Sequence, residues 1–259
     1  MHQKNSEIYN AVLFNYVLGL GDDLLVAGHR LSEWCGHAPL LEEDIALSNI
    51  ALDMIGGADA FLQLAGRLED KGRSGDDLAF FREAVEFKNY QLLELPLGDF
   101  AFTMMRQFIF DNYCYFLYGE LSKSSNQDVA GIAARIYKEV LYHMRHSGEW
   151  IQRLGGGTEE SRARLQNAAD ELWTYTRELF QTEDEFKILA ENGVVPDMAR
   201  FREQWFQRIH ESFTEAGIIM PSDDRYFSQN SRKGFHTEYL GHLLSEMQIV
   251  ARSFPGAKW

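Results

Sequence analysis

The chain has 259 residues, 45% of them hydrophobic and 25% charged, so we expect a folded protein with a large core rather than a disordered one. A net charge of -14 and a pI of about 5.0 disfavour binding to nucleic acid or to an anionic membrane surface. The two cysteines, Cys35 and Cys114, predict neither a disulfide framework nor a zinc site. No signal-peptide layout opens the chain and no apolar run reaches about 18 residues, so we expect a cytoplasmic protein without membrane spans.

Apolar residues recur at a spacing close to 3.6 through most of the chain, which predicts amphipathic helices. The first helix is expected over 6–34, with a break near Gly19 and Gly21. The second, within 39–66, is expected to be about 26 residues long. Its apolar stripe is expected to comprise Leu41, Ile45, Leu52, Ile55 and Leu62.

Further helices are expected after the second one, with a loop over 218–234. Alternation with a period of two is nearly absent, so the sequence predicts an all-α protein. Long helices joined by short turns favour one domain over 1–259, with a four-helix core and peripheral helices. The further helices are expected at 76–94, 99–121, 126–153, 159–181, 183–192, 197–216 and 232–252.

The stretch "KEVLYHMRHSGEW", residues 138–150, raises the question of a metal site. Two-iron helical bundles take one Glu from each of two helices and Glu-x-x-His from each of the other two. Here Glu139 and His143 are four residues apart, and Val140 stands three before the histidine. The spacing alone leaves two interpretations open: an iron site with shifted spacing, or the remains of one.

Three segments carry a resemblance to a known family: "LSEWCGHAPLLEEDIALSNIALDMIGGA", "KEVLYHMRHSGEWIQRLGGGT" and "KGFHTEYLGHLLSEMQ". They resemble the PaaC-type subunits of phenylacetyl-CoA epoxidases, from about residue 16 to the closing "PGAKW". The resemblance implies a ferritin-like fold and a PaaA-like catalytic partner that holds the iron. It also implies a PaaB-like component and a PaaE-like reductase with FAD and iron-sulfur. Such an assembly converts the ring of phenylacetyl-CoA to a 1,2-epoxide with O2 and NADPH.

The resemblance also implies where the ligands of a two-iron subunit would fall in this chain. Apolar side chains or glycine stand at four of the six positions and cannot coordinate iron, so no cofactor is expected here. Two remaining donors would hold a metal weakly, and a filled apolar core would replace the site. The six positions are Leu24, Met54, Gly57, Asp111, Val140 and His143.

Asp111 and His143 have two interpretations: a residual metal or proton-handling pair, or a buried polar pair that satisfies itself across two helices. Glu139 and His143 could also pair along one helix. The favoured function is a non-catalytic subunit that stabilises the iron-bearing one. The alternatives are a two-iron oxygenase or oxidase using Asp111, Glu139 and His143, and a homodimeric regulator or scaffold.

Three other patterns carry weaker hypotheses. Glu238, His242 and Glu246 recur at spacings of four, which indicates a metal or interface network, or a solvated or partner-facing charged stripe. One helix would spread these ligands over about 12 Å, too far for one metal. Cys35 and His37 are interpreted as a helix end rather than a nucleophile pair. The aromatic stretch "FIFDNYCYFLYG" is interpreted as core or subunit interface.

Overall fold

The structure, a computed structural model, describes residues 2–181, 183–222 and 230–257. Its contacts divide the chain into two compact units. Unit 1 comprises Met1–Pro96, Asp184–Glu191 and Asn230–Trp259, and unit 2 comprises Leu97–Glu183 and Asn192–Gln229. Helices and no strands occur in the described ranges, which confirms the all-α prediction. The prediction of one domain over 1–259 stays a prediction.

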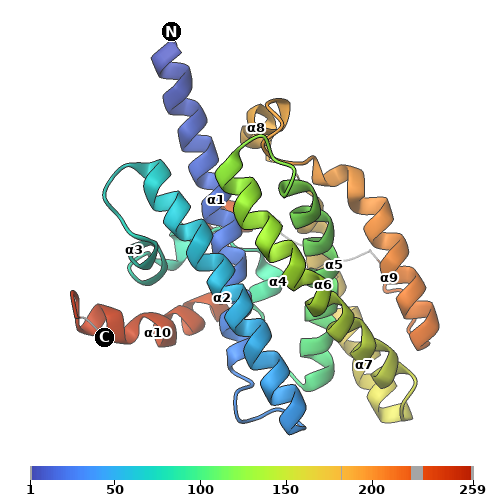
Figure 1. The fold of residues 1–259 in the computed structure, drawn as a ribbon. Helices are drawn as coiled ribbons and strands as arrows, with labels where there is room; N and C mark the ends of the chain where they lie inside the picture. Colours follow the sequence, from blue (N-terminus) through green and yellow to red (C-terminus); the bar gives the residue numbers. More distant parts are fainter. Residues whose placement is uncertain (1, 182, 223–229, 258–259) are drawn as a thin grey trace. The chain divides into compact units, whose positions relative to one another are not determined.

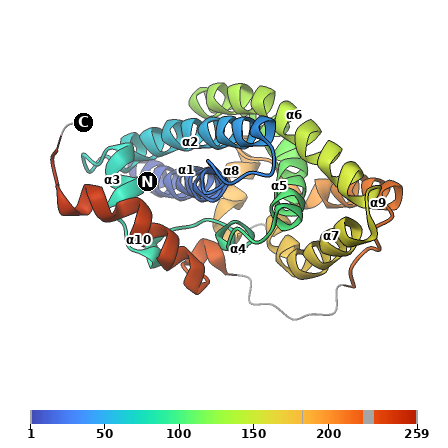
Figure 2. The same ribbon diagram turned by 90° about the horizontal axis from the view of Figure 1, so that it is seen from below.

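Unit 1 is built on two long helices, α1 (His2–Ser32) and α2 (Leu41–Glu69), which lie side by side (Figures 1 and 2). The C-terminal helix α10 (Glu238–Ser253) contacts the short helices that follow α2. Those short elements are α3 (Gly75–Phe80), η1 (Ala84–Glu86) and α4 (Gln91–Glu94), while η3 (Asp184–Phe186), α8 (Lys187–Glu191) and η5 (Ser231–Lys233) complete the unit.

Unit 2 is centred on α5 (Phe100–Leu121), which packs against α6 (Gln127–Gly155), α7 (Glu159–Leu172) and α9 (Arg202–Ala216). Side chains are buried on nearly every side of α5, as expected for a helix that is apolar all round. The Asp99 side chain caps α5 by accepting a hydrogen bond from the Phe102 amide. Two 3-10 segments, η2 (Trp173–Phe180) and η4 (Met198–Phe201), extend α7 and precede α9.

The predicted break in α1 at Gly19 and Gly21 is wrong, because the helix continues through both. Close side-chain approach explains the glycines. A Cβ at Gly19 would lie 2.7 Å from Nη1 of Arg232, and one at Gly21 would lie 2.8 Å from Cδ2 of Leu62. These glycines therefore make room for neighbouring side chains within unit 1.

The predicted apolar stripe of α2 is wrong for most of its members. Leu41, Ile45 and Leu52 are 74%, 54% and 65% exposed, whereas Leu62 is buried. Apolar residues cover more than one face of this helix, so periodicity alone selects the wrong face. The face that is buried carries Leu47, Ile50, Ala51, Met54, Gly57, Ala58, Phe61, Leu62, Leu64 and Ala65.

The helix predicted over 76–94 is wrong, because the chain forms three short pieces there. Backbone amides of Lys88 and Tyr90 donate to the carboxylates of Asp22 and Asp23 rather than to helical carbonyls. The helix predicted over 232–252 begins later, at Glu238. Gly234 before it adopts a φ of 85°, and a Cβ there would lie 2.3 Å from the Val85 carbonyl oxygen.

The remaining helices are confirmed with small shifts at their ends. α5 and α6 match 99–121 and 126–153 closely, and α6 ends at the predicted glycine run. The helices predicted over 159–181, 183–192 and 197–216 each contain a 3-10 segment. Part of the predicted loop, 223–229, and Lys258 and Trp259 of the closing motif lie outside the described residues.

Within the described residues, Ile8–Ser32 and Leu41–Glu69 are long and apolar enough to cross a membrane by length and composition. The most apolar window is 72% buried inside the protein in the first and 44% in the second. Core helices of soluble proteins meet the same criterion. The absence of membrane spans stays a prediction.

Candidate functional site

Asp111 lies in the core of unit 2, where α5 faces α6. It is 1% exposed, and His143 on α6 is 2% exposed. Gln107 Nε2 donates to Oδ1 of Asp111 at 2.6 Å, and Ser147 Oγ donates to Oδ2 at 2.8 Å. Ser147 stands one turn beyond His143 on the same helix and supplies a hydrogen bond between the two helices. Ser147 was not predicted from the sequence, although its i+4 spacing from His143 was a readable signal.

Burial raises the pKa of Asp111 from 3.8 to about 6. The charge of His143, the hydrogen bonds from Ser147 and Gln107, and the charge of His146 oppose this rise. The group is therefore a carboxyl that titrates near neutral pH and whose two oxygens already accept hydrogen bonds from protein side chains. It can hold or release a proton within the core.

Neither Val140 nor Glu139 completes a metal-ligand set with Asp111 and His143. Val140 is 3% exposed and fills its position on α6 with an apolar side chain. Glu139 is half-buried, and its carboxylate lies 3.8 Å from Nε of Arg135. Among the described residues, no group of three or more His, Cys, Asp or Glu side chains is arranged to hold a metal ion. The side chains present thus do not fit a two-iron centre, and the assignment of Asp111 and His143 stays a prediction.

The first three implied positions belong to unit 1 and are also buried. Leu24 on α1 and Met54 on α2 are 2% and 3% exposed, and Gly57 is buried one turn beyond Met54. Leu24 offers no atom that coordinates iron, and Gly57 has no side chain. In unit 1 these positions contribute to packing instead.

A network of buried ions in unit 1 was not predicted from the sequence. Asp22 on α1 forms an ion pair with Arg82, and both side chains are nearly inaccessible to solvent. Arg82 also donates to the Glu86 carbonyl at 3.0 Å and lies 4.1 Å from the centre of the Phe87 ring. A pair of aspartates within an otherwise apolar stretch of α1 was the signal that could have predicted this network.

Asp23, the next residue, anchors the segment before α10. Arg232 Nη2 donates to its Oδ2 at 2.6 Å, and the same guanidinium lies 3.8 Å from the centre of the Tyr90 ring. Arg232 Nη1 also donates to the carbonyl oxygens of Gly19 and Lys88, at 3.0 and 2.5 Å. Burial raises the pKa of Asp23 to about 7, with the charge of Arg232 opposing the rise.

Glu94 at the end of α4 is a further buried acid of unit 1. Its Oε2 accepts hydrogen bonds from the amide and hydroxyl of Thr237, both at 2.7 Å, and Nδ1 of His236 lies 2.5 Å from Oε1. Burial lowers the pKa of His236, but the hydrogen bond and charge of Glu94 outweigh it, so the pKa is raised. The motif "KGFHTEY" is thereby tied to the core of unit 1.

The remaining candidates lie apart from these clusters. Glu238, His242 and Glu246 are exposed along α10, in agreement with the charged-stripe interpretation. Nδ1 of His37 lies 3.1 Å from the backbone carbonyl oxygen of Cys35, whose side chain is an exposed free thiol. The segment after α1 is a helix end, as predicted. Most of the aromatic stretch on α5 is core, including Phe108, Phe110, Tyr113 and Tyr118.

Long paired helices with buried polar residues define an all-helical protein. The phenylacetic acid catabolic protein family, which groups PaaA and PaaC, matches residues 1–259, and the chain belongs to it. The PaaC subunit of 1,2-phenylacetyl-CoA epoxidase from Escherichia coli strain K12 is 41% identical to it over 244 residues. The match covers 94% of this chain and 98% of the relative, which confirms the predicted resemblance.

Proposed function

We propose that this chain is a non-catalytic structural subunit of a 1,2-phenylacetyl-CoA epoxidase in aerobic phenylacetate degradation. The observation that carries the proposal is the 41% identity to a PaaC epoxidase subunit across 98% of that relative's length. The partner is a PaaA-like catalytic subunit that holds the iron, and PaaB-like and PaaE-like components complete the assembly. Iron then belongs to the partner, FAD and iron-sulfur belong to the reductase, and the complex works in the cytoplasm.

The chemistry of the buried residues supports the non-catalytic part of this proposal. Val140 supplies an apolar side chain where the implied set requires a carboxylate. Asp111 accepts one hydrogen bond from Gln107 on its own helix and one from Ser147 on α6, so both of its oxygens are engaged by protein side chains and one of them joins α5 to α6. Residues in these roles stabilise the fold. The function proposed for the chain is therefore to bind its partner rather than to catalyse a reaction.

The exposed apolar stripe of α2 supports the pairing part of the proposal. Leu41, Ile45 and Leu52, here called the α2 stripe, lie on the outer side of the helix with more than half of each side chain exposed. Solvent-facing apolar groups at helical spacing mark protein interaction sites. We assign the α2 stripe to the contact with the iron-bearing subunit.

Turnover by the reconstituted epoxidase tests whether this chain is catalytic. In the double variant Asp111→Ala/His143→Ala, phenylacetyl-CoA-dependent NADPH oxidation should stay within about twofold of wild type, because neither group contacts substrate in this proposal. Size-exclusion chromatography of the same samples shows whether the complex has assembled. Loss of turnover with assembly unchanged would contradict the non-catalytic role.

Iron content and complex formation address the two alternatives. Elemental analysis of the chain expressed alone in iron-rich medium should give close to no iron, whereas a two-iron oxygenase would carry about two per chain. Mixing with a PaaA-like subunit should produce a heteromeric peak. A homodimer that does not change on mixing would favour the regulator or scaffold instead.

A further inference from the structure

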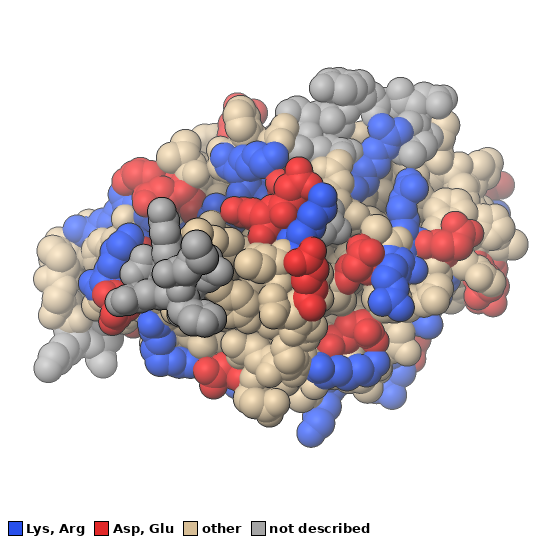
Figure 3. Space-filling model, turned by 90° about the horizontal axis from the view of Figure 1, so that it is seen from above, with Lys and Arg blue, Asp and Glu red and all other residues tan. Residues whose placement is uncertain are grey.

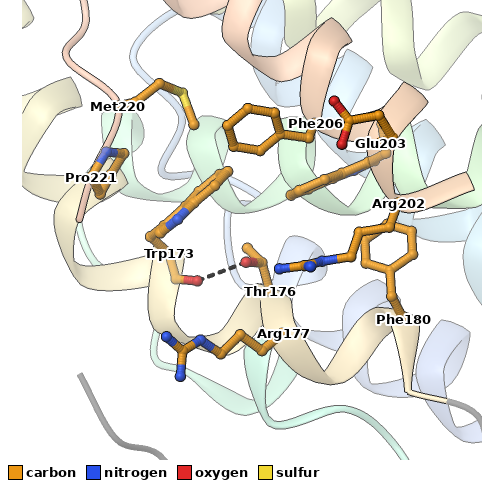
Figure 4. Close-up of a pocket in the computed structure, with 10 residues that line it drawn as sticks. Trp173, Thr176, Arg177, Phe180, Arg202, Glu203, Phe206, Met220 and Pro221 are labelled. Atoms are coloured by element: carbon orange, nitrogen blue, oxygen red, sulfur yellow. Dashed lines mark hydrogen bonds between the residues drawn. The ribbon is translucent and has the colours of Figure 1, made fainter. Parts of the chain in front are cut away.

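Unit 2 contains a cavity that the proposed structural role does not use. It lies between η2, the start of α9 and the segment just after α9, and its volume is about 340 Å³ (Figure 4). Ligand pockets for small molecules begin at about 300 Å³ and combine apolar walls with a few polar groups. Since liquid water takes about 30 Å³ per molecule, the space accommodates roughly eleven non-hydrogen atoms of ligand.

Aromatic side chains form the walls of this cavity. Trp173 and Trp205 are buried and stack with their ring centres 5.6 Å apart and an angle of 20° between planes. Trp205 is fixed further by its Nε1, which donates to the Ile109 carbonyl at 3.3 Å. Phe206 lies edge-on to Trp173 and remains 40% exposed. A rigid wall with an exposed ring beside it favours a flat aromatic ligand.

Arg202 supplies the polar contact. Its guanidinium extends over the cavity toward Thr176 (Figure 4). Within the described part of the chain, this guanidinium makes no hydrogen bond or ion pair. Thr176 Oγ1 already donates to the Trp173 carbonyl at 2.7 Å, so its proton is engaged. Arg202 is therefore a donor available to a ligand, and its planar fork matches a carboxylate.

The charges around the cavity restrict the anion further. Arg177 and Arg202 contribute two positive charges and Glu203 one negative charge, so the lining carries a net charge of about +1. That balance suits a single carboxylate. A CoA ester carries several phosphate charges and far more atoms than the cavity can hold, so it does not fit.

We propose that the cavity walled by Trp173, Trp205 and Phe206 binds a small aromatic monocarboxylate of one ring, whose carboxylate pairs with Arg202. The ring lies against the aromatic wall and the carboxylate meets the guanidinium. The proposed site is inferred from the cavity of unit 2 and does not depend on the structural role proposed above.

Isothermal titration calorimetry on the full chain, with phenylacetate as the probe, tests the site. One site per chain is expected. Arg202→Gln should raise the Kd at least tenfold, because it removes the fork that pairs with the carboxylate. The matched control is Arg200→Gln, an exposed arginine two residues earlier that does not line the cavity, and its Kd should equal that of wild type. Equal weakening by both variants would overturn the site, since only the overall charge would then matter.

Two analogues separate the contributions of ring and charge. Phenylacetamide keeps the ring without the charge, and cyclohexylacetate keeps the charge without the aromatic face. Each should bind at least several-fold more weakly than phenylacetate. Equal affinity for either analogue, or no heat from phenylacetate at millimolar concentration, contradicts the proposal. Thermal unfolding of each variant confirms that it is folded.

Discussion

The buried carboxyl of Asp111 shows how one residue links packing to pH. Its pKa rises to about 6 because the folded state removes it from water, whereas in the unfolded chain it returns to 3.8. The native state thus binds more protons than the unfolded state between these values, and stability falls as pH rises through them. Ionisation of Asp111 in the folded state lowers the free energy of unfolding by an amount on the order of 3 kcal/mol, and this loss is complete above pH 6.

Asp111→Asn should flatten this pH dependence. The amide keeps the shape of the side chain and cannot ionise. From pH 4 to pH 7 the wild type should therefore lose stability that the variant keeps, so the free energy of unfolding of the variant should rise relative to that of wild type. Urea unfolding at several pH values measures it. Asp23, whose pKa is also raised, is present in both proteins and cancels in the comparison. A difference that stays constant with pH would contradict the assigned pKa.

At the scale of elements, the segment 230–237 is held to the rest of unit 1 by hydrogen bonds and ion pairs of side chains. Arg232 is one anchor, since it pairs with buried Asp23 and donates to two backbone carbonyls. Removing one partner of a buried ion pair leaves the other charge uncompensated, which typically costs about 3–5 kcal/mol. The start of α10 therefore depends on a residue that lies outside the helix.

Arg232→Ala should lower the free energy of unfolding by about 3–5 kcal/mol. The matched control is Lys233→Ala, an exposed neighbour with the same loss of charge, which should change it by less than about 0.5 kcal/mol. Because Asp23 then lacks its cation, adding Asp23→Asn should recover part of the loss. Urea denaturation of wild type, the three single variants Arg232→Ala, Lys233→Ala and Asp23→Asn, and the double variant provides the test. Additive losses in the double variant would argue against the pair.

An element is predictable from the sequence when its backbone hydrogen bonds join residues close together in the chain, and is less so when they join distant residues. α5 and α6 were predictable because local apolar periodicity and caps such as Asp99 agree with the fold. The segment 81–90 was not, because its amides bond to Asp22 and Asp23, which lie more than 60 residues away in the chain. Likewise, Asp111 and His143 were predicted as buried, but Ser147 was recognised only from its contact.

At the scale of the whole molecule, charge and exposed apolar surface have separate roles. The net charge of -14 favours solubility, and on the face shown in Figure 3 acidic and basic side chains are interspersed. Partner choice then depends on apolar groups that folding leaves exposed. In unit 1 these include the α2 stripe, whose side chains contribute little to the core because more than half of each faces solvent.

Leu52→Glu should therefore weaken binding to the iron-bearing subunit without unfolding the chain. Leu52 is 65% exposed, so the free energy of unfolding should change by less than about 0.5 kcal/mol. Burying the new carboxylate against an apolar partner surface should cost at least about 2 kcal/mol of binding, roughly a thirtyfold rise in Kd. Calorimetric titration with the partner measures this effect.

The matched control for Leu52→Glu is Val85→Glu, which introduces the same charge at an apolar side chain that is 72% exposed on η1 and is not part of the α2 stripe. Its Kd should stay near the wild-type value, because long-range repulsion from one added surface charge is screened within about 8 Å at physiological salt. If both variants weakened binding alike, net charge would govern the association. If neither did, the α2 stripe would face solvent in the complex, and the contact with the catalytic subunit would have to use another surface.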